Sequence, residues 1–506
     1  MFASVLSAAI FGMEVCPIQV EADVSNGLPS FTMVGYASAQ VKEAQERVRT
    51  ALKNSGVALP PRRITVNFVP ADIKKEGAGF DLPVAAAVLA ASGMLKPELL
   101  TDVMMVGEVS LNGEIHPVSG ILPRVIHAGE TGLRFCVIPS GNLKEGLLVK
   151  NIKVIGVRTL REMMLFLQNP EKHFAGQEEM CKVIDEKPED FKEIQGQEGA
   201  KRAAEIAAAG FHNILLIGPP GAGKTMLARR IPTIMPDLTE AEGMELTKIY
   251  SIAGLLSEEA PLILKRPFRN PHHTSPPQAL TGGGRNPGPG EITLSHRGIL
   301  FLDEFPEFSR AALETLRQPL EDREIVLSRA SGTYHFPANF MLVAAMNPCP
   351  CGYYPDMNRC TCTAGQVSHY LGKISRPLLD RIDICTDIPA VTFSQMTDQE
   401  KGESSFEMKV RVEKARDIQK ERYKKEGIRF NGEMTGKQIK KYCTCTREGE
   451  RLLGMAFEKM KFSARSYHKV LRTARTIADL QGKELLDSSH IGEALYCRAF
   501  DKKYWN

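Results

Sequence analysis

The chain has 506 residues, of which 43% are hydrophobic and 25% are charged, and its formal net charge is +4. This length exceeds what one hydrophobic core usually serves, so we expect two or three domains in an ordinary soluble protein. The small positive charge permits an anionic partner without requiring one. The longest apolar run, residues 84–95, is too short to cross a bilayer, which takes about 20 residues, so no membrane span is expected.

The N-terminus predicts a first β-strand rather than a secretory signal. It is apolar, but no basic residue precedes Lys42, and a secretory signal needs a charged segment at its start. We therefore expect a cytoplasmic protein whose eleven cysteines stay reduced. In that compartment disulfides are rare, which favours metal binding wherever cysteines cluster.

Hydrophobic periodicity divides the chain into four parts. Residues 1–168 alternate strand-like and helix-like runs and predict an α/β domain. Residues 169–190 are charged, lack an apolar stripe and resemble a linker. Residues 191–395 predict a second α/β domain, and residues 396–506 are almost wholly helical in pattern.

The second domain begins with a phosphate-binding motif. Residues 218–225, GPPGAGKT, fit the full P-loop pattern, with an apolar strand before them and a helix after them. Glycines let backbone N–H groups surround the β-phosphate, lysine reaches the β- and γ-phosphates, and the hydroxyl is a ligand of Mg²⁺. The residues expected to bind ATP and Mg²⁺ are Gly218, Gly221, Gly223, Lys224 and Thr225. A chance glycine-rich turn is the alternative.

Two later strands end in polar residues. Residues 298–304, GILFLDE, are an apolar strand with two acids at its end. After a P-loop, Asp303 is expected to hold Mg²⁺ through its water shell, and Glu304 to orient and deprotonate the attacking water. The strand FMLVAAMN ends in Asn347, which would approach the γ-phosphate, unless it is only a turn residue before Pro348.

This order of P-loop, acidic strand and polar strand end resembles the AAA+ ATPases, and the resemblance implies two arginines. Arg381 in SRPLLDRIDI matches the finger that one subunit inserts into its neighbour's ATP site. Arg465 in FSARSYHKVL matches the sensor arginine of the helical lid. Either could instead be a surface salt-bridge residue. If Arg381 acts in trans, a lone subunit is incomplete and a ring, by resemblance a hexamer, is implied.

Four cysteines fall within residues 349–362 as two CxC pairs eight residues apart. Four thiolates suit a closed tetrahedral Zn²⁺ site, although free thiols or disulfides are alternatives. The predicted ligands are Cys349, Cys351, Cys360 and Cys362. This insert begins just after Asn347 and ends before the Arg381 segment, so a structural metal there would stiffen the connection between them. Cys443 and Cys445 form another CxC without a second pair nearby, and we treat them as lid residues.

Longer motifs indicate which family of AAA+ proteins the chain resembles. The stretch RPFRNPHHTSPPQALTGGGRNPGPGEITLSHRGILFLDE, together with NPCPCGYY and LLDRIDI, resembles the ComM/YifB family of magnesium-chelatase-like AAA+ proteins. The resemblance implies a hexameric motor that moves on single-stranded or branched DNA with little sequence preference and drives branch migration in homologous recombination and natural transformation. One departure is Arg376, where the family pattern has glycine, which leaves two arginines as candidates for the finger.

The basic segments of the chain, taken without the family resemblance, are weaker evidence for DNA binding. The insert at 266–290 carries Arg266, Arg269, His272, His273 and Arg285 among prolines and glycines. These cations could follow a phosphate backbone, or the insert could be a solvated loop or a subunit contact. The basic run at 409–430 is expected to be a solvated helix face.

The N-terminal domain resembles the Lon-type protease domain in the segments KKEGAGFDLP and GEVSLNGEIHPVSGILPRV. A Lon-like protease needs a serine and lysine pair, but Gly79 and Leu122 occupy the two positions. Ser110 or Ser119 with Lys74 or Lys75 would be misplaced substitutes, so peptidase activity is not expected. The alternatives to a DNA motor are therefore a magnesium-chelatase-type subunit that remodels a protein partner and, less favoured, an ATP-dependent protease.

Overall fold

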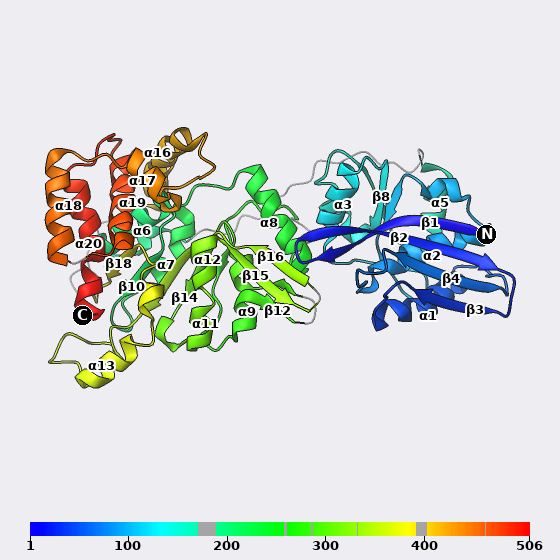
Figure 1. Ribbon diagram of the computed structural model, residues 1–506, viewed down its shortest axis with the longest axis horizontal. Helices are drawn as coiled ribbons and strands as arrows, with labels where there is room; N and C mark the ends of the chain where they lie inside the picture. Colours follow the sequence, from blue (N-terminus) through cyan, green and yellow to red (C-terminus); the bar gives the residue numbers. More distant parts are fainter. Residues whose placement is uncertain are drawn as a thin grey trace.

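The computed structural model describes residues 1–170, 189–257, 261–284, 287–330, 332–390, 402–460 and 462–505. The molecule is elongated, with the N-terminal sheet at one end, the C-terminal helices at the other and a second sheet between them (Figure 1). Residues 171–188 of the predicted linker lie outside the described residues. None of the described helices is long and apolar enough to span a bilayer.

The N-terminal region is built on a mixed sheet of seven strands. β1 forms an antiparallel hairpin with β2, and β5, β8 and β9 continue the sheet in parallel. In spatial order the strands are β3 (Ser30–Val34), β4 (Arg63–Val69), β2 (Glu14–Ser25), β1 (Phe2–Phe11), β5 (Val103–Met105), β8 (Phe135–Pro139) and β9 (Lys153–Val157). The helices are α1 (Ala39–Asn54), α2 (Asp81–Ala91), α3 (Ile121–Glu130), α4 (Leu143–Gly146) and α5 (Leu160–Gln168). The predicted first strand and α/β alternation are confirmed.

The longest apolar run of the sequence forms α2, and all eleven residues of this helix are buried. A helix that is apolar on every side must be enclosed by protein or lipid. Here β1 and β2 cover it, and Asp81 at its first position is neutralised by two hydrogen bonds of 2.9 Å from Arg47. The run is therefore a core element.

The central region is built on a parallel sheet of five strands. The order places β10 between β17 and β18, so the P-loop follows an interior strand of the sheet. In spatial order the strands are β11 (Phe268–Arg269), β14 (Ile299–Leu302), β17 (Met341–Met346), β10 (Ile214–Ile217) and β18 (Ile384–Asp387). β14, β17 and β10 are wholly buried, as expected for a parallel sheet covered on both faces. The predicted α/β core is confirmed, and the structure shows that its sheet is parallel.

Helices and two hairpins complete this region. The P-loop helix is α7, and β15 and β16 form an antiparallel hairpin beyond α12. The elements are α6 (Glu198–Gly210), α7 (Lys224–Ile234), α8 (Glu240–Ala253), α9 (Pro277–Thr281), β12 (Gly282–Gly283), β13 (Gly288–Pro289), α10 (Glu291–Leu294), α11 (Arg310–Glu314), α12 (Arg317–Asp322), β15 (Glu324–Arg329), β16 (Gly332–Pro337), α13 (Ala364–Leu371) and α14 (Arg376–Leu379).

The C-terminal region is helical, as predicted. Its helices are α16 (Ser405–Tyr423), α17 (Gly436–Tyr442), α18 (Arg447–Met460), α19 (Ala464–Leu480) and α20 (Ser488–Trp505). α16 and α19 pack on α6 and share one hydrophobic core with the central sheet. Cys443 is buried here, and its thiol lies 3.6 Å from the carbonyl oxygen of Leu471.

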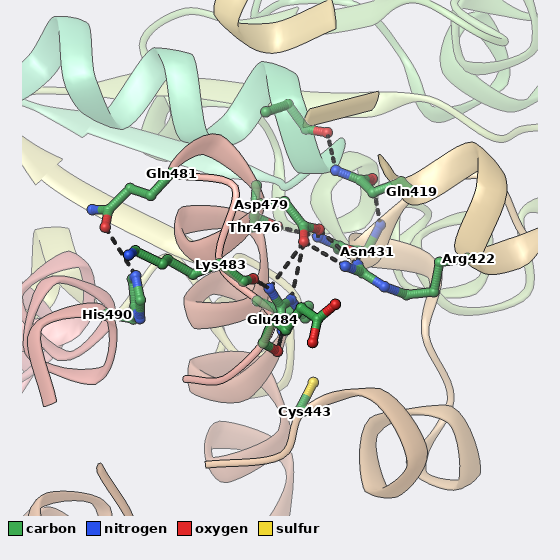
Figure 2. Close-up of polar contacts among 12 residues, drawn as sticks. Gln419, Arg422, Asn431, Cys443, Thr476, Asp479, Gln481, Lys483, Glu484 and His490 are labelled. Atoms are coloured by element: carbon green, nitrogen blue, oxygen red, sulfur yellow. Dashed lines mark hydrogen bonds and ion pairs between the residues drawn. The ribbon is translucent and has the colours of Figure 1, made fainter. Parts of the chain in front are cut away.

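A buried polar network at the end of α19 joins these helices to the central region (Figure 2). Asp479, whose side chain is fully buried, accepts hydrogen bonds from Arg422 and from Asn431, the latter at 2.8 Å. Gln419 donates to the carbonyl oxygen of Ala209 at the end of α6. A buried carboxylate is tolerated when its charge is paired and its oxygens are hydrogen-bonded. The network therefore fixes the position of α19, which carries Arg465 near its other end.

Candidate active site

The P-loop joins β10 to α7 and turns through two left-handed residues, Gly221 at φ 73° and Gly223 at φ 82°. Glycine adopts this conformation without the cost that a Cβ imposes. α7 begins at Lys224, and its first residues have no side-chain cap. Their N–H groups are therefore available to an anion, and the helix dipole favours negative charge at this end.

The carboxyl ends of three neighbouring strands meet at the P-loop. Lys224 Nζ donates to Asn347 Oδ1 at 3.0 Å and to the carbonyl oxygens of Gly218 at 2.8 Å and Pro219 at 2.9 Å. Thr225 Oγ1 lies 2.7 Å from Asp303 Oδ2. Burial lowers the pKa of Lys224, so a phosphate would be a favourable partner for its ammonium group. The structure thus brings together the residues after β10, β14 and β17 that the sequence analysis selected.

Glu304 follows Asp303 at the end of β14 and adopts a left-handed backbone conformation, φ 50°. This conformation is uncommon for a residue with a side chain. The Glu304 N–H donates to Asp303 Oδ1 at 2.9 Å, and its side chain is 60% exposed. Its carboxylate oxygen Oε2 lies 2.8 Å from His273 Nδ1.

Arg381 and Arg465 both donate hydrogen bonds to one carboxylate, Glu321, which the sequence did not mark as a site residue. Glu321 of α12 accepts a hydrogen bond from Arg381 and, through its other oxygen, one of 2.9 Å from Arg465. Among the described residues, neither guanidinium contacts the P-loop. No sequence signal marks Glu321, since it precedes Arg381 by 60 residues and Arg465 by 144.

Arg376 has a different environment. Its guanidinium donates to the carbonyl oxygen of Trp505 at 3.4 Å, near the end of α20. It does not share the Glu321 contact, which sets Arg381 apart as the arginine that is grouped with Arg465.

The four cysteines of the insert converge. Their sulfur atoms all lie within 4.8 Å of one another, and three pairs are separated by 3.3, 3.5 and 3.8 Å. Zn²⁺ with bonds of about 2.3 Å to four sulfurs places them roughly 3.8 Å apart, so the four thiols fit this ion. The residues are Cys349, Cys351, Cys360 and Cys362.

The cysteine insert also touches the P-loop. A Cβ added to Gly352 would lie 2.4 Å from Pro220 Cδ, so the two segments are in direct contact. On its other side the Tyr354 ring lies 6.3 Å from that of Tyr504 in α20. The insert therefore bridges the P-loop and the C-terminal helix, which the sequence analysis did not predict.

Two arginines of the insert at 266–290 have partners within the fold. Arg266 has a buried side chain that donates to the carbonyl oxygens of Pro236 and Arg297. Arg269 forms a bidentate pair with Glu291 at 2.6 and 2.7 Å. Arg285 lies outside the described residues. Both guanidinium groups already have partners within the fold, and the Arg269 side chain remains 31% exposed, so a role of these arginines along a phosphate backbone stays a prediction.

The basic run in α16 is only partly a solvated face. Arg416 lies 3.6 Å from the centroid of the Phe430 ring, and burial lowers its pKa to about 10. Arg422 pairs with buried Asp479. The charge pattern of the sequence did not predict these contacts, because long arginine side chains can reach buried partners from a helix surface.

The N-terminal region holds its lysines in structural contacts. Lys75 Nζ donates to the carbonyl oxygens of Gly35, Phe68 and Pro70, and Lys74 pairs with Glu76. Leu122 is buried, and its N–H donates to Glu145 at 2.8 Å. Ser110 donates within its own turn. These contacts leave both lysines unsuited to take a proton from a serine.

The parallel sheet, the P-loop and the acidic strand end define a nucleotide-binding protein of the magnesium-chelatase-like AAA+ class. Comparison with protein families agrees with this. The model of magnesium chelatase, subunit ChlI, matches residues 190–396. Subunit ChlI of Mg-chelatase matches residues 20–142, and the C-terminal model of the same subunit matches residues 402–498.

Individual relatives identify the family. Competence protein ComM of Haemophilus influenzae is 41% identical over 513 residues, which cover 98% of this chain and 97% of the relative. The uncharacterized protein YifB of Escherichia coli is 40% identical over 496 residues, covering 98% and 96%. The chain belongs to the ComM/YifB family of magnesium-chelatase-like proteins. A shorter match, 30% over 127 residues and 25% of this chain, joins it to Lon protease 2 of Bacillus subtilis, of which it covers 22%.

Proposed function

We propose that the chain hydrolyses ATP as a subunit of a ring, a hexamer, that moves on single-stranded or branched DNA in the cytoplasm. Its role would be branch migration in homologous recombination and natural transformation. The observation that carries the ATPase proposal is the convergence of Lys224, Thr225, Asp303 and Asn347 at one edge of the parallel sheet. The DNA proposal rests on the similarity to a protein named for competence.

Each residue of this edge has a role in the proposed reaction. The P-loop N–H groups and Lys224 bind the phosphates, and Thr225 and Asp303 hold Mg²⁺, which neutralises phosphate charge when it is bound. Asn347 positions the γ-phosphate. Glu304 accepts a proton from the attacking water, because its carboxylate stands at the strand end beside Asp303.

The ring proposal is supported by the position of the arginines. Arg381 and Arg465 stabilise the transferred phosphoryl group in this proposal, yet in a single subunit both contact Glu321 and neither contacts the P-loop. In this proposal Arg381 is the finger that acts on the site of a neighbouring subunit and Arg465 is the sensor arginine of the helical lid, so a lone chain is incomplete.

The cysteine insert holds Zn²⁺ as a structural ion in this proposal. It follows Asn347 directly and contacts Pro220, so the metal keeps the γ-phosphate sensor and the P-loop in register.

The N-terminal region, residues 1–168, has a Lon-like fold without peptidase activity and forms a collar on the ring. The AAA+ core at 191–395 and the helical lid at 396–506 are the other proposed domains, joined by the linker at 169–190. The proposed lack of peptidase activity in the N-terminal region rests on Gly79 and Leu122 and on the contacts of Lys75.

The test is the ATPase rate of the purified protein with and without single-stranded and branched DNA, with Glu304→Gln as the control. We expect stimulation by DNA that is lost in the variant, and displacement of a three- or four-stranded junction. Hydrolysis that ignores DNA would contradict the motor. It would favour the second candidate, a magnesium-chelatase-type subunit that remodels a protein partner, which the family relationship supports.

A further inference from the structure

The backbone that follows Arg381 is held by side chains from distant parts of the chain. The carbonyl oxygen of Arg381 itself accepts a hydrogen bond of 2.9 Å from Asn213 Nδ2. The next carbonyl oxygen, that of Ile382, accepts two hydrogen bonds, from Lys469 Nζ at 2.8 Å and from Arg498 Nη1 at 2.9 Å. A carbonyl oxygen has two lone pairs, so two cations occupy this one fully.

Both cations come from the C-terminal helices and are buried. Lys469 lies in α19 and Arg498 lies in α20, and each residue is 4% exposed. Arg498 Nη1 also lies 3.4 Å from the carbonyl oxygen of Asp383. The two helices therefore contact the two residues that directly follow Arg381.

Two buried cations are more than one carbonyl oxygen needs. A buried C=O requires a partner, but the neutral amide of Asn213 meets that requirement at Arg381. A buried cation also requires a compensating charge, and Asp383, which is 6% exposed, supplies one. Burial alone would raise the pKa of Asp383, yet the charges of Lys469 and Arg472 lower it, so the side chain is a carboxylate. Hydrogen bonds from charged donors are stronger than those from neutral ones, so this peptide is held more firmly than a neutral donor would hold it.

The end of α20 contacts the same part of the chain at two further points. Tyr504 donates from its hydroxyl to Asp387 Oδ1 at 3.0 Å, at the end of β18. Trp505 Nε1 donates to the carbonyl oxygen of Leu371 at 3.1 Å, at the end of α13. The last helix therefore holds the chain both before and after Arg381.

We propose that Lys469 and Arg498 are positioning residues for Arg381, which fix the peptide after it and so set the direction in which its guanidinium reaches a neighbouring subunit's phosphate. This inference rests on the proposed function, in which Arg381 acts in trans. A misplacement of about 1 Å can cost about 100-fold in rate, so a firm backbone anchor is required for a side chain that is supplied by another subunit.

The experiment compares Arg498→Gln with Arg498→Lys in the full-length chain. Glutamine removes the charge and shortens the side chain, so we expect kcat to fall about ten-fold, with the Kd for a fluorescent ATP analogue unchanged. Lysine keeps a cationic donor and should retain about half of the wild-type kcat or more. Hydrogen exchange measured by mass spectrometry should be faster at residues 380–383 in Arg498→Gln and unchanged there in Arg498→Lys.

Mixing of subunits shows whether the loss lies in the finger or in the variant's own ATP site. Arg498→Gln subunits keep Glu304, and Glu304→Gln subunits keep Arg381 with its anchor. In a randomly mixed ring about a quarter of the interfaces combine an intact site with an intact finger, so activity should rise about five-fold above the mean of the two separate proteins. A neighbour's finger would not correct damage to the variant's own nucleotide site.

Arg202→Gln is the matched control. Arg202 in α6 also joins the central region to α20, through Glu493 at 2.8 Å, and its other partner among the described side chains is Glu205. It should leave kcat and the exchange of residues 380–383 unchanged. Thermal unfolding establishes that each variant is folded. If Arg498→Gln is not, Lys469→Gln takes its place, since it leaves Arg498 on the same carbonyl oxygen.

Two results would overturn the inference: an unchanged kcat in Arg498→Gln, or a loss of kcat that mixing with Glu304→Gln does not correct. A failure of the proposed function would look different, because Arg381→Ala would then keep its kcat. Hydrogen exchange would in that case still decide whether Arg498 holds the peptide after Arg381.

Discussion

The residues proposed for ATP hydrolysis form two groups that the fold holds in different ways. Lys224, Thr225, Asp303 and Asn347 contact one another directly at the ends of buried parallel strands. Arg381, in the turn after α14, and Arg465, in α19, contact Glu321 of α12. The first group is rigid because a parallel sheet fixes its strand ends, whereas the second depends on partly exposed side chains.

This difference indicates that nucleotide binding and the action of the arginines depend on different parts of the assembly. The nucleotide-binding group is complete in one chain, while the arginine group is held on a carboxylate that a phosphate could replace. The Arg465–Glu321 pair is exposed on both sides, and such a pair contributes about 0–1 kcal/mol, so exchanging Glu321 for a neighbour's nucleotide costs Arg465 little. Arg381 is 15% exposed and also donates to the carbonyl oxygens of Arg317 and Pro377, so it is held more firmly. Four experiments test the division, from the largest expected effect to the smallest.

Replacing Arg381 should have the largest effect, because an arginine supplied in trans to a phosphoryl group is worth about 10³–10⁵ in rate. We expect Arg381→Ala to lose at least about 10³-fold in kcat and to retain ATP binding. Arg376→Ala is the control and should keep most activity, since it contacts Trp505 instead. The reverse result would assign the finger to Arg376.

Glu304→Gln should lower kcat by about 10³-fold, within the range for a general base, with ATP binding unchanged. Mixing it with Arg381→Ala then tests the division directly. If the arginine acts in trans, about a quarter of the interfaces in a randomly mixed ring combine intact Glu304 with intact Arg381, so activity returns. A mixture that stays inactive would place both groups in one subunit.

Loss of metal from the cysteine insert should weaken nucleotide binding, because the insert contacts Pro220. We expect Cys360→Ser to raise the KM for ATP about ten-fold, with bound zinc measured by atomic absorption. Cys385→Ser, at a cysteine outside the cluster, is the control for loss of a thiol. Stoichiometric zinc in the Cys360→Ser protein would contradict the four-ligand site.

Glu321→Gln should have the smallest effect. It weakens the contacts to both arginines, and an ion pair worth up to 1 kcal/mol corresponds to no more than about five-fold in rate, so we expect a two- to three-fold increase in kcat. Asp322→Asn removes a neighbouring exposed charge and should have no effect. A large fall in kcat would show instead that Glu321 is needed to orient the arginines.

The N-terminal and central regions also show why fold and chemistry must be argued separately. Both regions contain a sheet covered by helices, and part of the chain is similar in sequence to Lon protease 2. Lys75, however, is engaged by three carbonyl oxygens, and Leu122 is part of the core. In the central region the residues at the strand ends, rather than the sheet, carry the proposed function.

Local patterns predicted most of the elements. The apolar N-terminus predicted β1, and the alternation of strand-like and helix-like runs predicted the α/β character of residues 1–168, because burial depends directly on side-chain periodicity. Patterns failed for the charged segments. Arg266, Arg269, Arg416 and Arg422 were candidates for solvent or DNA, yet each reaches a carbonyl, a carboxylate or a ring of the fold. The position of a charged residue in the sequence does not reveal which group its side chain contacts in the fold.

The sequence by itself determined three strands of the central sheet, β10, β14 and β17, and the polar residues that follow them. A P-loop, an acidic strand end and a four-cysteine insert are contiguous motifs whose chemistry follows from residue type and spacing. Only the tertiary structure decided the partners: His273 for Glu304, Glu321 for both arginines, and Pro220 for Gly352. These contacts join residues far apart in the chain, and they exist because the strand order and the packing of helices on the sheet bring those residues together.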